Sequence, residues 1–154
     1  MGKLLSLEKK LIIVSWVKSK QTLARVSGDD GNSLTIDILN AWLDKSIHYI
    51  SIEDENRNIV GFCTLETILN DEIEMCHLLV KPRSRHYIDI GCSIIKKAIN
   101  YSRSKNYNIL WGRAISGNSF TYKIAVERNN FDKILDIPIY LDSRFDWYKL
   151  HLNH

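Results

Sequence analysis

Residues 76–99, CHLLVKPRSRHYIDIGCSIIKKAI, are the most informative stretch of the sequence. An apolar run leaves through Val80 and Pro82 into a basic loop, which enters a helical pattern beside Gly91. Proline at position 82 ends the strand because it has no N–H to donate to a sheet. The start of a helix carries free backbone N–H groups and the positive end of the helix dipole. The stretch therefore predicts a strand, a loop and a helix that favour a phosphate-bearing ligand, with positive charge added by Lys81, Arg83, Arg85 and His86.

Two helical patterns precede this stretch. In residues 7–17 apolar side chains recur at helical spacing, and Ser6 stands where an N-cap is expected. In residues 33–46 the same spacing returns, with Ser33 or Thr35 able to cap the helix. The apolar positions of the first pattern are Leu7, Leu11, Val14 and Val17, and those of the second are Leu34, Ile38, Leu39 and Trp42.

Short β-rich runs follow the two helical patterns. Residues 47–52 and 59–67 are joined by the charged turn EDENRN, and a third run covers residues 72–80, which together predict an antiparallel meander. The elements predicted after it are a helix at about 89–104, a strand at 108–115, a short helix at 118–127 and two β-rich pieces at 133–141 and 144–152. This order predicts an α/β or α+β layered fold, a mixed and mostly antiparallel central sheet of about six or seven strands flanked by helices.

Length and composition limit the class of protein. The 154 residues, 45% of them hydrophobic, fit a single domain over 1–154 with its own core. The longest uninterrupted apolar run is residues 11–14, far short of the ~20 residues that span a bilayer, so no membrane partner is expected. Cys63, Cys76 and Cys92 are odd in number and lack C-x-x-C spacing, which disfavours disulfides and a metal site and suits a reducing cytoplasm.

The basic loop resembles that of the GNAT superfamily of N-acetyltransferases, which carries V-x-P-x-x-R-x-x-G-x-G/A after its central strand. Four residues match this pattern in kind: Val80, Pro82, Arg85 and Gly91. Gly91 lies six residues after Arg85, one more than in the family, and Ile88 or Asp89 replaces the earlier glycine. Asp89 is a candidate N-cap for the following helix, and its carboxylate would also repel a pyrophosphate.

Two other segments extend the resemblance along the chain. NSFTYKIA, beginning at Asn118 and leading to Asn130-Phe131, is similar to the N-x-x-S-x-x-V-A-E-K-x-G-F of the ribosomal-protein acetyltransferase-like branch. Asn130 replaces a glycine there, and asparagine tolerates the left-handed conformation. Upstream, Val60-Gly61-Phe62 sits where the family has the v-G-f of a strand pair. The resemblance covers nearly the whole chain.

The resemblance implies an acyltransferase that uses acetyl-CoA as cosubstrate and needs no metal. It implies that the amides between Arg85 and Gly91 curl around the pyrophosphate. It also implies that the fourth and fifth strands of the fold splay apart, so that an N–H of residues 72–80 meets the acetyl carbonyl. Contacts with the cosubstrate are implied for Leu79, Val80, Arg85, His86, Tyr87, Ile88, Asp89, Ile90, Gly91, Cys92 and Asn118.

Transfer of an acetyl group to an amine needs a base and is helped by an acid. Glu74 is the preferred base, directly or through water, and His77 is the rival because its pKa suits neutral pH. Tyr122 is the candidate acid, one turn before Ala125, where many family members have tyrosine. Each also has a plainer explanation, as an edge charge, a structural histidine or a packing residue. Regular alternation predicts Glu72, Glu74, Cys76, Leu78 and Val80 on one face of the strand, and Ile73, Met75, His77 and Leu79 on the other.

Three functions fit the sequence. The first is an N-acetyltransferase that moves an acetyl group directly from acetyl-CoA to a primary amine of a small molecule or a protein. The second is a catalytically degenerate acyl-CoA-binding protein, favoured by the missing loop glycine. The third, ranked last, is a nucleic-acid-associated protein, favoured by a net charge of +3, the basic patch at 81–86 and the pair Trp147-Tyr148. The aromatic C-terminal strand suits a homodimer edge, and equally an edge packed on its own sheet.

Overall fold

The computed structural model describes residues 4–18, 33–115 and 126–152. Within these ranges the elements are α1 (Leu7–Val14), α3 (Ile36–Lys45), β1 (His48–Glu53), β2 (Ile59–Leu69), β3 (Glu72–Val80), α4 (Tyr87–Ser104), β4 (Ile109–Ile115), β5 (Asp132–Ile134) and β6 (Phe145–His151). Their order agrees with the prediction. The helix predicted at 118–127 lies mostly outside the described residues.

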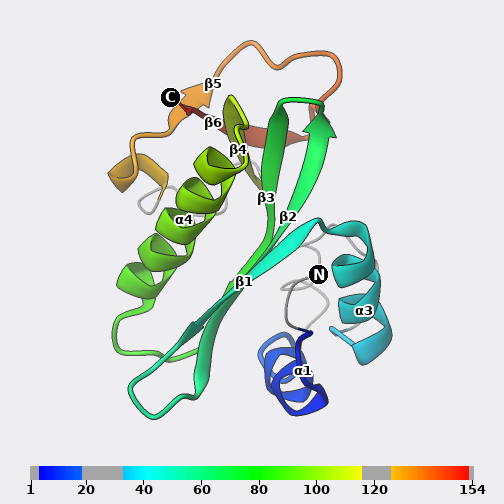
Figure 1. Cartoon of the computed structure of the whole chain (residues 1–154), viewed down its shortest axis with the longest axis vertical. Helices are drawn as coiled ribbons and strands as arrows, with labels where there is room; N and C mark the ends of the chain where they lie inside the picture. Colours follow the sequence, from blue (N-terminus) through cyan, green and yellow to red (C-terminus); the bar gives the residue numbers. More distant parts are fainter. Residues whose placement is uncertain (1–3, 19–32, 116–125, 153–154) are drawn as a thin grey trace.

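The strands form one sheet in the order β1-β2-β3-β4-β6-β5. Every neighbouring pair is antiparallel except β3 and β4, which are parallel. Figure 1 shows α4 along one face of the sheet and α1 and α3 on the other. The predicted mixed, mostly antiparallel sheet flanked by helices is confirmed. No helix in the described ranges combines the length and the apolarity that a bilayer crossing requires.

Two predicted N-caps are present. Ser6 Oγ accepts a hydrogen bond of 3.2 Å from the amide of Lys9, and Thr35 Oγ1 accepts one of 3.2 Å from the amide of Ile38. Each hydroxyl satisfies a donor that the first turn of a helix leaves free. Of the two residues considered for the second helix, Thr35 is therefore the cap.

The buried face of α1 differs from the predicted one. Leu7 and Leu11 are 63% and 53% exposed, whereas Ile13 is fully buried against the cluster that α1 forms with α3 and β2. The consecutive apolar residues at 11–14 allow two helical stripes, and packing on the sheet selects the one through Ile13. The helix also ends at Val14, before the predicted residue 17.

The β-rich piece predicted at 133–141 is mostly wrong. Only β5 is a strand, and the residues that follow it include Leu135 and Ile139, which are 92% and 102% exposed. Pro138 lies within this run and has no N–H for a ladder hydrogen bond, which opposes a longer strand. Apolar character alone therefore gave a false strand signal here.

Helix α4 packs closely on the sheet at Gly61. Gly61 lies on β2, and a Cβ atom built there would be 2.8 Å from Ile94 Cδ1 and 3.0 Å from Ile90 Cγ2. Such distances leave no room for a side chain unless the Ile94 and Ile90 side chains or the helix move. The contact brings α4 against the core that includes Cys63, Leu65 and Ile95.

Replacement of Gly61 by alanine is expected to lower the free energy of unfolding by about 1–3 kcal/mol, because an overpacked core forces side chains or backbone to move. Urea unfolding of the variant and the parent measures this difference. Ile94→Val removes Cδ1, so Gly61→Ala should cost less in that background. An equal cost in both backgrounds would show that the contact with Ile94 is not the cause.

Candidate active site

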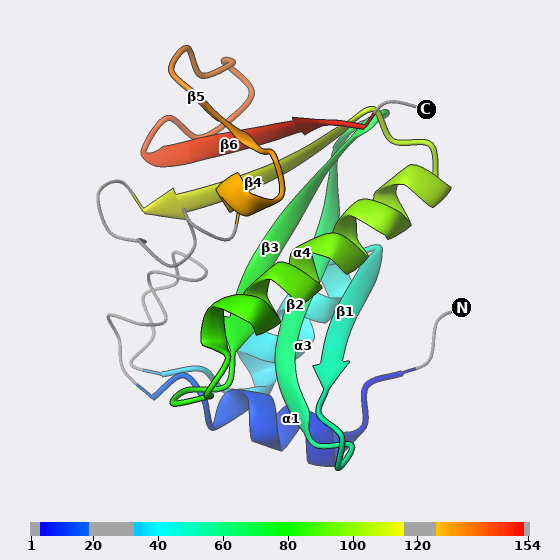
Figure 2. The same ribbon diagram turned by 90° about the vertical axis from the view of Figure 1, so that its left-hand side faces the viewer.

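The strands β3 and β4 separate along their length. They pair from Glu72 opposite Ile109 to Met75 opposite Gly112, and no further. β3 nevertheless continues to Val80, and Figure 2 shows the two strands diverging from a common start. The second half of β3 thus has, among the described residues, no strand partner on its β4 side. This is the splay that the family resemblance implied.

A β-bulge changes the direction of the side chains within β3. Phe62 and Thr64 of β2 lie opposite Leu79 and Cys76 of β3, so β3 carries one residue more than β2 over this interval. His77 lies inside the interval and has a φ of 55°, in the left-handed region. An extra residue of this kind shifts the alternation of side chains beyond it by one position.

The bulge makes the predicted faces of β3 wrong beyond Cys76. His77 stacks on Trp42 of α3, and Leu79 packs in the cluster of α1 and α3. The two rival bases, Glu74 and His77, therefore share the face opposite α4. The side chains on the α4 face are Ile73, Met75, Leu78 and Val80.

His77 is held by its neighbours. Its Nδ1 lies 2.8 Å from Thr64 Oγ1, and its ring stacks on that of Trp42 with a centroid distance of 4.0 Å and an interplanar angle of 6°. The side chain is half-buried. These contacts connect α3 to the bulge and favour a structural role for His77.

Glu74 is a buried carboxylate of this face, with 6% of the residue exposed. Arg113 of β4 places Nε 2.9 Å from Glu74 Oε2, and 34% of the arginine side chain is exposed. Oε2 accepts no well-directed hydrogen bond from the described residues. The pair thus depends on charge and proximity, and it has one buried end and one exposed end.

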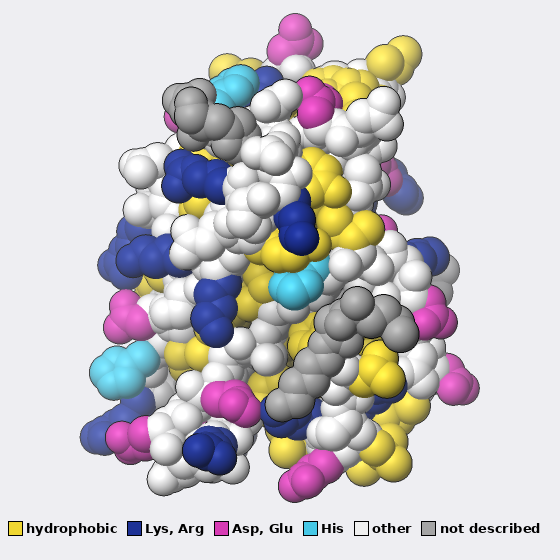
Figure 3. All heavy atoms as spheres, in the orientation of Figure 1, with side chains coloured by type: hydrophobic (Ala, Val, Ile, Leu, Met, Phe, Trp, Pro, Cys, Tyr) yellow, Lys and Arg dark blue, Asp and Glu magenta, His cyan; other side chains and the backbone are white. Residues whose placement is uncertain are grey.

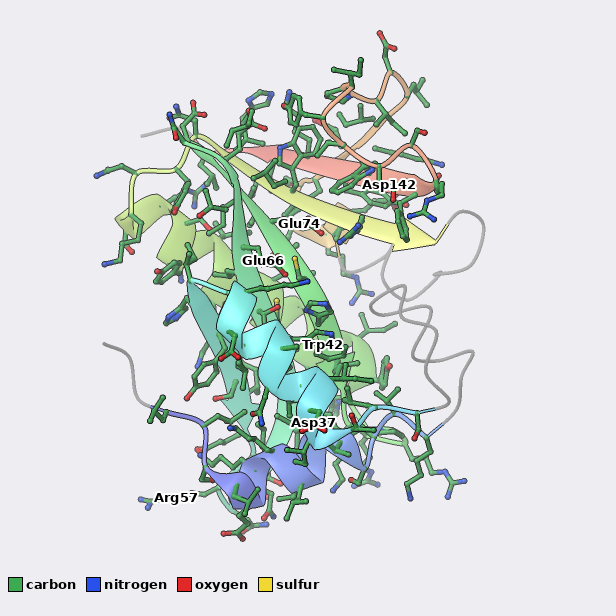
Figure 4. All side chains as sticks on the ribbon, turned by 90° about the vertical axis from the view of Figure 1, so that its right-hand side faces the viewer. Asp37, Trp42, Arg57, Glu66, Glu74 and Asp142 are labelled. Carbon is green, nitrogen blue, oxygen red and sulfur yellow. The ribbon has the colours of Figure 1, made fainter. Side chains whose placement is uncertain are left out.

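Four influences set the ionisation of Glu74. The pKa of the carboxyl group is raised to about 7 on balance, with burial as the largest cause and with the charge of Arg113 and the thiol of Cys76 opposing the rise. Glu66, directly opposite on β2, raises the pKa further by like-charge repulsion. Figure 4 shows Glu66 and Glu74 side by side, with Trp42 of α3 below them in the view. A base with a pKa near 7 suits proton transfer at neutral pH.

Glu72 lies two residues before Glu74 and has a different environment. Its Oε1 accepts hydrogen bonds from Trp111 Nε1 at 2.6 Å and from the hydroxyl of Tyr140 at 2.8 Å. Burial and the hydrogen bond to Glu72 raise the pKa of Tyr140 to about 12. Glu72 therefore joins β3 to β4 and to the segment before β6, which is a structural role.

The start of α4 offers free donors. The helix begins at Tyr87, and the N-cap residue His86 makes no side-chain capping bond. Within the part of the chain that the structure describes, the amides of Tyr87, Ile88 and Asp89 donate to no protein acceptor. The prediction that Asp89 is the N-cap is wrong. The helix starts two residues before Asp89, and Ile88 in its first turn already packs against the core.

Asp89 is the acidic residue of the first turn. Its carboxylate is 72% exposed and lies 3.7 Å from His86 Nδ1 and 3.9 Å from Arg128 Nη1. The loop before the helix exposes Lys81, Arg83 and Arg85. In Figure 3, Lys and Arg side chains gather on the side of the molecule where α4 lies. The loop before the helix thus carries three exposed cationic side chains against the one carboxylate of Asp89.

Most of the predicted cosubstrate contacts lie at the end of β3, in the loop after it and in the first turns of α4. Arg85, His86 and Tyr87 are exposed, Ile88 and Ile90 are half-buried, and Gly91 and Cys92 are buried inside α4. Leu79 and Val80 are buried at the end of β3 that leads to the loop. The remaining two predicted site residues, Asn118 and Tyr122, lie outside the described residues.

Arg113 and Glu66 were not predicted as site residues. Arg113 interrupts the apolar strand ILWGRAI, and an isolated charge in such a strand is a usable signal. Its partner could not be read from the sequence, because pairing with Glu74 depends on the parallel register of β3 and β4. Glu66 likewise becomes relevant only through its position opposite Glu74.

Three solved acetyltransferases are similar to this chain in fold. An acetyltransferase of the GNAT family from Staphylococcus aureus Mu50 gives a TM-score of 0.71 at 15% identity, over 97% of this chain and 96% of that one. The spermidine N-acetyltransferase from Vibrio cholerae, in complex with CoA and spermine, gives 0.71 at 14% identity, over 97% and 94%. The ribosomal-protein-S18-alanine N-acetyltransferase from Escherichia coli gives 0.61 at 12% identity, over 96% and 88%. No family model and no curated protein matches the sequence.

The chain therefore has the fold of the GNAT N-acetyltransferases. The resemblance that its sequence suggested is confirmed for the fold.

Proposed function

We propose that this protein is an acetyl-CoA-dependent N-acetyltransferase that moves an acetyl group to a primary amine by direct transfer. The observation that carries the proposal is the splay of β3 from β4, which runs between the free amides of α4 and the buried carboxylate of Glu74. An anion site at one end and a base at the other are the two groups that this reaction needs.

The distance between the two ends favours an elongated cosubstrate. Val80 lies six positions after Glu74, which corresponds to roughly 20 Å of strand at about 3.3 Å per residue. A compact nucleotide bound at α4 would not reach the carboxylate. CoA carries a long pantetheine arm between its pyrophosphate and its thiol, and the unpaired edge of β3 offers N–H and C=O groups along that path.

Different residues of the chain would bind the cosubstrate and accept the proton. The amides of Tyr87, Ile88 and Asp89 hold the pyrophosphate, with positive charge from the loop. Acetyl-CoA supplies an acetyl group on a thioester. Glu74 takes the proton that the attacking amine loses as its nitrogen forms a bond to the acetyl carbon, and the C–S bond then breaks with the thiolate as leaving group.

A specific observation favours a second function, CoA binding without turnover. Asp89 places a carboxylate in the first turn of α4, close to the amides that would hold the pyrophosphate. Exposed ion pairs such as those of Asp89 with His86 and Arg128 offset this charge only weakly. A cosubstrate held less firmly at its pyrophosphate can bind without reaching the geometry that turnover needs, and the protein would then act as a CoA sensor.

The test has two parts. Isothermal titration with acetyl-CoA is expected to give 1:1 binding, and Asp89→Asn should tighten it because the variant removes a like charge near the pyrophosphate. Release of CoA thiol is then followed over a panel of polyamines, amino acids and peptide N-termini. Absence of binding at millimolar acetyl-CoA contradicts both functions, whereas binding with no thiol release over the panel supports the second.

A further inference from the structure

We infer that Arg113 is the positioning residue of the acetyl-transfer site, holding Glu74 in the ionised form that can accept a proton. The inference rests on the proposed function for its catalytic meaning, but the effect of Arg113 on Glu74 can be measured without any substrate. It assigns a role to a residue outside the strand, loop and helix that carry the family resemblance.

The position of Arg113 supports this role. It follows directly after Gly112, the last β4 residue that pairs with β3, and so lies where the two strands begin to separate. Its Nε is 2.9 Å from Glu74 Oε2, and it belongs to the strand across the splay from the carboxylate. Arg113 therefore lies beside Glu74 at the point where the splay begins.

The guanidinium group is itself held in place. Its Cζ lies 4.8 Å from the ring centroid of Phe145 and 5.5 Å from that of Trp147, both on β6. β4 and β6 are paired over their whole lengths, with Arg113 opposite Trp147. Contacts with aromatic faces restrict an arginine that would otherwise turn into solvent. The charge beside Glu74 is thus fixed by two strands.

The groups around Glu74 act in opposite directions. Glu66 of β2 disfavours a charged Glu74, as does burial, whereas the thiol of Cys76 on β3 favours the charged form. Cys63 of β2 stays a neutral thiol, because burial raises its pKa. Arg113 of β4 is the cation among the described groups that act on Glu74. Without it, burial and Glu66 would hold the carboxyl group protonated to a higher pH, and a protonated carboxyl group cannot serve as a base.

The experiment measures the ionisation of Glu74 directly. The chain is labelled with glutamate carrying ¹³C at the side-chain carboxyl, and the Glu74 signal is assigned by its loss in Glu74→Gln. The midpoint of its pH titration is expected to rise by about 1 to 3 pH units in Arg113→Gln, the usual effect of an opposite charge at this distance. Arg113→Lys should restore most of the difference. Phe145→Leu, which removes one of the two rings, should give a smaller rise and serves as a second route if Arg113→Gln does not fold.

Lys149→Gln is the matched control. Lys149 is also a cation on an aromatic ring, 5.3 Å from the centroid of Trp111, but it does not act on the ionisation of Glu74. Its removal should leave the Glu74 midpoint unchanged. A midpoint in Arg113→Gln equal to that of the parent, or a rise of the same size in Lys149→Gln, overturns the inference.

Kinetics separate this inference from the proposed function. In Arg113→Gln the acid limb of kcat/KM should move to higher pH with the NMR midpoint, and the rate should recover above the new midpoint, while KM for acetyl-CoA is unchanged. A purely structural role would lower the rate at every pH and so contradicts a positioning role. If no amine is acetylated by the parent protein, the proposed function fails, while a shifted NMR midpoint still supports the action of Arg113 on Glu74.

Discussion

Replacement of Glu74 by glutamine is expected to lower kcat about 10²- to 10⁴-fold, the usual contribution of a general base. Glutamine keeps the size of the side chain and cannot accept the amine proton. Binding of acetyl-CoA should be unchanged, because the amides proposed to hold the pyrophosphate lie at the other end of β3. Steady-state kinetics with an acceptor found in the panel, together with isothermal titration, measures the two quantities.

Glu66→Gln is the natural control for this prediction. It removes a carboxylate directly opposite Glu74 but leaves the base itself intact. Since Glu66 raises the pKa of Glu74, its loss should move the acid limb of kcat/KM to lower pH with little change in the plateau. Equal losses of activity in the two variants would mean that Glu74 has no special role.

The same Glu74→Gln substitution is expected to stabilise the fold at alkaline pH. The free energy of unfolding of the variant, relative to the parent, should increase by about 3 kcal/mol between pH 4 and pH 8. The pKa of Glu74 is raised, mainly by burial, from its ordinary 4.5 to about 7 in the folded protein. Between these two pH values the folded protein keeps a proton that the unfolded chain has released. The contribution of Glu74 to the stability of the parent protein is fully present below pH 4.5 and is lost as the pH rises through 7. The neutral glutamine has no such loss.

Urea unfolding at several pH values measures this difference. Glu72→Gln is the comparison. The glutamine oxygen can still accept the hydrogen bonds of Trp111 and Tyr140, but they lose the charge of the acceptor, so the free energy of unfolding should fall. A constant difference between Glu74→Gln and the parent across the pH range would show that Glu74 titrates normally in the folded protein. The raised pKa, and with it the case for Glu74 as a base at neutral pH, would then be lost.

Local signals in the sequence predicted much of the fold. The bounds of β3 follow from its apolar run and Pro82, and the cap at Thr35 follows from its position before an amphipathic helix. The hairpin between β1 and β2 closes through Asp54, whose Oδ1 accepts hydrogen bonds of 2.9 Å from two amides of the charged turn. Each feature depends on residues close together in the chain.

The parts that could not be predicted depend on contacts between distant segments. The bulge in β3 is centred on His77, and histidine is a weaker signal for a positive φ than glycine. The position is held by Thr64 and by Trp42, which is 35 residues earlier in the chain. Without the bulge in view, regular alternation separated the two rival bases. The importance of Arg113 depended in the same way on strand register.

The bulge also determines which β3 side chains pack against α4. If β3 were a regular strand, Leu78 and Val80 would turn to the side of Glu74, and Leu79 would face the helix in their place. α4 would then face Leu79 and the imidazole of His77 where it now contacts Leu78 and Val80, and the two aliphatic side chains would move to the side of Glu74. One additional residue therefore lets the nine-residue strand β3 present aliphatic side chains to α4 on one face and keep Glu74 and His77 together on the other.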